Sequence, residues 1–60
     1  MFETGDIIAY HGTWDEAHGL VRVVAAAEGR CNAVGFGARS SIVLTGIRPG
    51  SATLVRRAEA

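Results

Sequence analysis

The chain has 60 residues, of which 48% are hydrophobic, and six arginines balance six acidic residues to give a net charge of zero. This length allows one domain, residues 1–60, with a thin core, because such a chain buries only about 60% of the surface that it exposes when unfolded. The composition is too apolar for a disordered segment, and the longest unbroken apolar run, Val23 to Ala27, is too short for a membrane-spanning helix.

Short apolar segments punctuated by turn residues, without helical periodicity, predict an all-β fold. The first strand is expected over residues 6–10 and the second over residues 20–26, with a loop over residues 11–18 between them. In the second strand Val21, Val23 and Ala25 share one face. The other face carries Leu20, Arg22 and Val24, so both faces are partly apolar.

The second half of the chain predicts three more strands, over residues 31–36, 41–45 and 52–56. Gly29, just before the first of them, suits the positive φ of a short hairpin turn. The sequence Arg-Pro-Gly-Ser at residues 48–51 is a strong turn signal, because Pro presets φ and Gly permits a positive φ. Five short strands in 60 residues predict a small barrel, with the last strand closing the sheet.

The opening third of the chain carries a family-like pattern. The pattern begins with Gly5-Asp6, which two isoleucines follow. It continues with Gly12, Gly19 and Val21, which are separated by seven and two residues. This pattern, over about residues 2–24, resembles the KOW motif of the SH3-like barrels found in ribosomal proteins and transcription elongation factors. The segment from Phe2 to Gly12 also resembles the polymerase-binding domain of CarD-type transcription regulators.

The resemblance implies a five-stranded SH3-like barrel that serves as a docking platform rather than an enzyme. A partner from the transcription or translation apparatus is then expected. The second half of the chain carries no comparable pattern.

The loop over residues 11–18 departs from the KOW segments that grip RNA, which carry Lys and Arg there. Its acidic residues Asp15 and Glu16 would repel a phosphate backbone, whose neutralisation supplies most non-specific affinity. Trp14 beside them fits the anchor of a protein interface, where Trp is enriched. The alternative is that Trp14 folds back over an open end of the barrel as part of the core. We predict a protein-binding site at Trp14, Asp15 and Glu16.

The charges divide along the chain. Residues 1–21 carry four acidic residues and no basic one, whereas residues 22–60 carry all six arginines and two glutamates. Halves of opposite sign can pair between copies, present an acidic rim to one partner and a basic rim to another, or intermix within one folded chain. If DNA or RNA binds, we expect it to use a predicted arginine face, made of Arg22, Arg39, Arg48, Arg56 and Arg57. The alternatives are ion pairs with another subunit, or solvated charges that discourage edge pairing.

Catalysis, cofactors and metals are not expected. His11, His18, Asp15 and Glu16 have the chemistry of zinc ligands, but their spacing matches no standard structural site. Solvated loop histidines beside acids are the alternative. Cys31 with a histidine could form a nucleophile and base pair, yet a single cysteine entering a strand is more often a packing residue.

Cys31 is the only cysteine, which excludes an intramolecular disulfide and fits a reducing compartment. We therefore expect a soluble cytoplasmic protein that does not enter a membrane. Small scaffolds without a disulfide or a metal usually gain stability by assembly. Self-association through an apolar strand face is expected to supply it.

Overall fold

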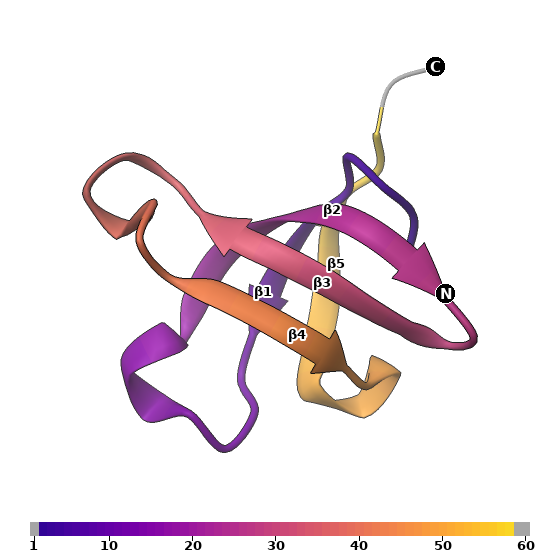
Figure 1. Cartoon of the computed structure of the whole chain (residues 1–60), viewed down its shortest axis with the longest axis horizontal. Coiled ribbons are helices and arrows are strands. Elements are labelled where there is room, and N and C mark those ends of the chain that lie inside the picture. Colours follow the sequence, from indigo (N-terminus) through magenta and orange to yellow (C-terminus); the bar gives the residue numbers. More distant parts are fainter. Residues whose placement is uncertain (1, 59–60) are drawn as a thin grey trace.

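The computed structural model describes residues 2–58, which form one antiparallel sheet of five strands (Figure 1). The strands are β1 (Ile7–Tyr10), β2 (Gly19–Ala27), β3 (Arg30–Gly35), β4 (Val43–Ile47) and β5 (Ala52–Arg56). Three 3-10 turns lie between them: η1 (Asp15–Ala17), η2 (Gly37–Arg39) and η3 (Pro49–Ser51). The prediction of an all-β fold with five strands is confirmed. Within residues 2–58 no helix has the length and apolar character needed to cross a membrane.

Closure of the sheet into a barrel, which the sequence implied, is not observed. The strand order is β4-β3-β2-β1-β5, so β4 and β5 are the two edges, and no ladder joins them within residues 2–58. The last strand pairs with β1 instead, placing Ala52 opposite Tyr10. Figure 1 shows β5 crossing behind β3 and β4 rather than lying alongside β4. Side chains from both edges, including Ile47 and Ala52, fill the space between the two halves of the folded sheet.

The turn between β2 and β3 consists of Glu28 and Gly29, whose φ angles are 54° and 77°. Positive φ at both central residues is the type I′ geometry, whose twist matches that of the flanking strands. The sequence predicted this conformation at Gly29, and the structure shows that Glu28 adopts it as well.

Strand β4 begins two residues later than the predicted segment 41–45. The reason is that the η2 turn extends further, since the Ile42 N–H donates to the Arg39 carbonyl at 2.9 Å. The strand instead takes in Gly46 and Ile47, and the side chain of Ile47 enters the core.

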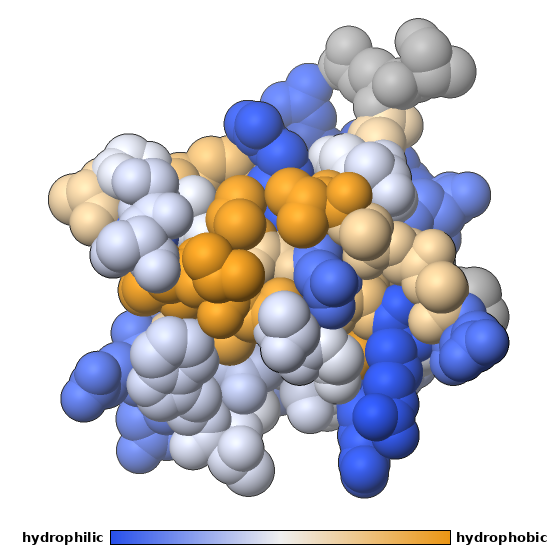
Figure 2. Space-filling view, in the orientation of Figure 1, coloured by the Kyte–Doolittle hydropathy of each residue, from blue (hydrophilic) through white to orange (hydrophobic). Residues whose placement is uncertain are grey.

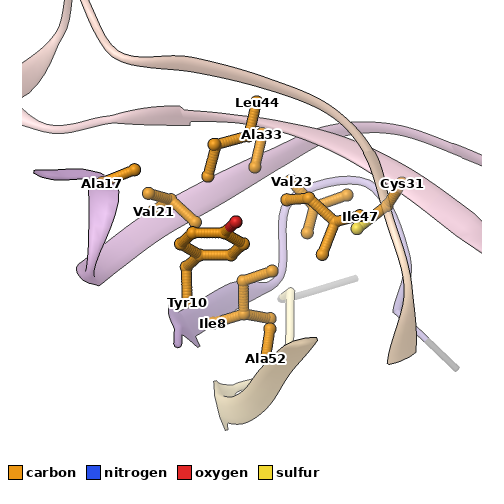
Figure 3. Packing of buried hydrophobic residues seen from close by; sticks show 10 residues of the cluster. All are labelled: Ile8, Tyr10, Ala17, Val21, Val23, Cys31, Ala33, Leu44, Ile47 and Ala52. Carbon is orange, nitrogen blue, oxygen red and sulfur yellow. The ribbon is translucent and has the colours of Figure 1, made fainter. Parts of the chain in front are cut away.

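The core is a cluster of ten buried hydrophobic residues to which all five strands contribute (Figure 3). Its members are Ile8, Tyr10, Ala17, Val21, Val23, Cys31, Ala33, Leu44, Ile47 and Ala52. The two valines of β2 point inward as their alternation predicted. A register irregularity follows Val23, and Ala25 beyond it is exposed.

Asp6 joins the two ends of the described chain. It is fully buried, and its carboxylate accepts hydrogen bonds from the backbone N–H groups of Ala58 (2.7 Å) and Glu3 (2.9 Å) and from Arg57 Nη1 (2.9 Å). These bonds, the one from Ala58 foremost, hold the pKa of the Asp6 carboxyl below its ordinary value. The ion pair fixes the end of β5 to the start of β1.

Candidate protein-binding site

The loop between β1 and β2 presents Trp14 to solvent. Trp14 is 43% exposed and does not belong to the core, where Ala17 of the same loop packs instead. Trp14 is therefore not the core plug that the sequence left open. Asp15 and Glu16, which follow it at the start of η1, are also exposed. The three residues of the predicted site thus form one exposed segment with an aromatic ring beside two carboxylates.

Arg39 of η2 holds this loop in place. Its guanidinium donates hydrogen bonds to the carbonyl oxygens of Ala17 (2.7 Å), His18 (3.0 Å) and Leu20 (3.0 Å). Gly19 leaves room for it, because a Cβ at that position would lie 2.7 Å from Arg39 Nη1, and the φ of 129° disfavours any side chain there. Arg39, which belongs to the predicted arginine face, therefore contacts the backbone at the base of the Trp14 loop.

Further hydrogen bonds lie within the loop itself. The Ala17 N–H donates to the Trp14 carbonyl at 3.0 Å, and His18 Nε2 donates to the Gly12 carbonyl at 2.6 Å. The His18 ring also meets the Tyr10 ring edge-on, with the ring centroids 5.8 Å apart. The loop is therefore ordered by its own contacts and by Arg39 before any partner binds.

The residues considered as zinc ligands do not converge. His11 Nε2 lies 3.1 Å from the Thr53 hydroxyl of β5, while His18 turns toward Gly12. Among the side chains of residues 2–58, no three or more His, Cys, Asp or Glu gather closely enough to hold a metal. Burial raises the pKa of the Cys31 thiol, so the sulfur stays protonated and packs in the core.

Two arginines of the predicted arginine face contact other parts of the fold. Arg39 contacts loop carbonyls, and Arg57 lies 2.9 Å from Asp6 and 3.5 Å from Glu3. Arg48 lies between β4 and η3. The acidic start and the basic end of the chain thus pair in part within one fold, as one of the alternatives held.

Arg22 and Arg56 do share a cross-strand row. Both lie opposite Ile7, one on β2 and the other on β5. Neighbouring strands are about 4.8 Å apart, so the two Cα atoms are separated by about 10 Å. The Arg22 guanidinium also lies 5.1 Å from the centroid of the Phe36 ring, within the range of a cation–π contact.

The outer face of β2, β3 and β4 is largely apolar, and we refer to it as the outer sheet face. Leu20 and Val24 are each 46% exposed, and Val43 is 56% exposed. Figure 2 shows apolar residues gathered across the middle of this face, with hydrophilic residues mostly around them. The two apolar faces predicted for the second strand account for Leu20 and Val24. Val43 belongs to the predicted strand over residues 41–45.

A cleft of about 320 Å³ lies beside β4. Core residues Tyr10, Leu44 and Ile47 line it, together with Thr13 of the loop, Arg48 and Ser51. No prediction from the sequence included this cleft, because its lining comes from segments that are distant in the chain.

Comparison of the chain with models of protein families, with curated proteins and with solved structures finds no match. The likeness of residues 2–24 to KOW and CarD-type segments stays a prediction. The functional interpretation is therefore based on the geometry of the Trp14 loop, the outer sheet face and the cleft.

Proposed function

We propose that this chain is a non-enzymatic protein-binding module whose main contact is the loop carrying Trp14, Asp15 and Glu16. The observation that supports this best is an exposed tryptophan on a loop that Arg39 already holds in place. Tryptophan is enriched among the few residues that dominate interface energies. A preordered loop also loses little conformational freedom on binding, which favours affinity.

The partner surface is expected to be basic around an apolar centre. Asp15 and Glu16 flank the tryptophan, and opposite charge on the partner would steer the encounter and fix the orientation. The likeness of residues 2–24 to KOW and CarD-type segments makes proteins of the transcription and translation apparatus the first partners to test.

Trp14→Ala tests the proposal in a pull-down against purified proteins of that apparatus. Loss of a hot-spot side chain lowers affinity by about 2 kcal/mol or more, roughly thirtyfold, so the variant should fail to recover partners that the wild type recovers. Val55→Ala is the matched control, because Val55 is 54% exposed on β5, outside the loop. Equal recovery by wild type and Trp14→Ala would refute the proposed contact.

We also propose that copies of the chain associate through the outer sheet face. The described residues expose 3895 Å², and a standard interface covers about 800 Å² per partner, roughly a fifth of that surface. Leu20, Val24 and Val43 lie on this face, so burying them would add apolar area that the thin core cannot supply.

Direct binding of DNA or RNA is the second candidate function, and the row formed by Arg22, Ile7 and Arg56 is the observation that favours it. The contacts that Arg39 makes with loop carbonyls and Arg57 makes with Asp6 weaken it, since phosphate binding gains from several available cations. Binding of this kind should fall steeply with salt and be lost when Arg22 and Arg56 are both changed to Ala. Absence of a salt-dependent gel shift at low ionic strength would exclude it.

A further inference from the structure

One charged residue, Arg48, is among the described residues that line the cleft beside β4. Thr13 also lines the cleft, and the chain continues from it into Trp14, Asp15 and Glu16. Figure 1 shows this loop and the η3 turn on the same side of the molecule, below β4.

Part of the cleft lining belongs to the core. Leu44, Ile47 and Tyr10 line the cleft, and each retains a small exposed fraction, between 4% and 9%. The Tyr10 hydroxyl accepts a hydrogen bond from the Trp14 N–H at 3.4 Å, so the backbone of the Trp14 loop lies directly beside the cleft. The volume of about 320 Å³ falls at the lower end of the range for ligand sites. It suits a few side chains rather than a large cofactor.

We propose that the cleft receives a segment of the protein partner that carries an acidic residue at one end, an aliphatic residue in the middle and a basic residue at the other end. This inference rests on the proposed function and defines the partner sequence that the Trp14 loop serves. The acidic side chain pairs with Arg48, whose planar guanidinium suits a carboxylate. The aliphatic side chain covers Leu44 and Ile47.

The basic residue of the partner segment then lies toward Asp15 and Glu16. A segment of the reverse order would place like charges together at both ends of the cleft, which lowers affinity and sets the direction of binding. A nucleic acid crossing the same cleft would bring phosphates against the two carboxylates, so a polypeptide is the better occupant.

The experiment is a selection from a library of random linear peptides displayed on phage, with the wild-type protein as bait. Selected peptides are synthesised, and their affinities are measured by calorimetry for wild type, Arg48→Glu, Trp14→Ala and Arg30→Glu. Arg30→Glu is the matched control, since it makes the same change at an exposed arginine outside the cleft. Arg48→Ala serves as a second variant if circular dichroism shows that Arg48→Glu is not folded.

The selected peptides should share an acidic and a basic residue that flank an aliphatic one. Arg48→Glu should weaken their binding about tenfold or more, and Arg30→Glu should leave it unchanged. Replacing the acidic residue of the peptide by lysine should restore binding to Arg48→Glu.

Peptides without an acidic residue, or peptides that bind Arg48→Glu as tightly as wild type, would overturn the assignment of the cleft. If Trp14→Ala still abolished their binding, the proposed function would stand while the inference failed. Selection of no peptide, or of peptides insensitive to both Trp14→Ala and Arg48→Glu, would overturn both.

Discussion

Replacing Arg39 by alanine tests whether the Trp14 loop is held in place by the η2 turn. The substitution removes three hydrogen bonds, to the carbonyls of Ala17, His18 and Leu20. One intramolecular hydrogen bond contributes about 0.5–1.5 kcal/mol net, and two of these three are solvent-exposed, so we expect a loss of about 3 kcal/mol. Small domains are stable by only about 5–15 kcal/mol, so this loss is a large fraction of the total.

Urea and thermal unfolding followed by circular dichroism measure this loss, which corresponds to a fall in Tm of about 12–24 °C for a domain of this size. Trp14 is the only tryptophan, so its fluorescence anisotropy reports the order of the loop directly. We expect faster local motion of Trp14 in Arg39→Ala. Arg39→Lys should recover only part of the stability, because an ammonium group lacks the fork that reaches three carbonyls.

Arg30→Ala is the control for Arg39→Ala, since Arg30 is exposed next to the β2–β3 turn and such positions tolerate change within about 0.5 kcal/mol. An Arg39→Ala protein as stable as Arg30→Ala, with unchanged Trp14 anisotropy, would refute the role assigned to Arg39. The order of the loop would then depend on the contacts within the loop, such as the hydrogen bond from His18 to Gly12.

Three further predictions concern stability and assembly. Hydrogen bonds lower the folded-state pKa of Asp6, so its contribution to stability is present above the unfolded-state pKa and is lost as the pH falls through the folded-state pKa. Acid titration followed by circular dichroism should show this loss of stability, and the stability of Asp6→Asn should depend less on pH over the same range. Gly19→Ala should destabilise the fold by about 1–3 kcal/mol in urea unfolding, unlike Gly50→Ala, where a Cβ meets no neighbour. Val43→Asp should convert an assembled species to monomer in light scattering, and a wild type that is already monomeric would refute assembly through the outer sheet face.

The strands could be predicted because their signals are local. The turn residue Gly29 and the Pro49-Gly50 pair mark the chain reversals, and the predicted segment 52–56 coincides with β5 at both ends. The start of β4 could not be found in the same way, because it depends on a hydrogen bond from Ile42 to the Arg39 carbonyl. Whether the sheet closes depends on how its two edges pack across the core, which no local pattern encodes.

The candidate site was predictable in composition but not in geometry. The local sequence around Trp14 does not determine whether its side chain is exposed or buried. In the structure the smaller side chain of Ala17 enters the core instead. Counting arginines could not reveal that Arg39 contacts a loop some twenty residues earlier, or that Arg57 pairs with Asp6 across most of the chain. These contacts join residues that are distant in sequence, so only the folded chain shows which charges serve the fold.

These contacts show which of the charges along the sequence serve the fold and which stay exposed. Arg57 and Asp6 neutralise each other where the chain ends meet, and Arg39 serves the loop backbone. Asp15 and Glu16 remain exposed beside Trp14, and Arg48 lines the cleft together with Thr13. The cleft is lined by β4 and η3 and by residues of β1 and the Trp14 loop, which are distant from β4 in sequence. The proposed binding mode therefore depends on the fold bringing these segments to the same place as the exposed tryptophan.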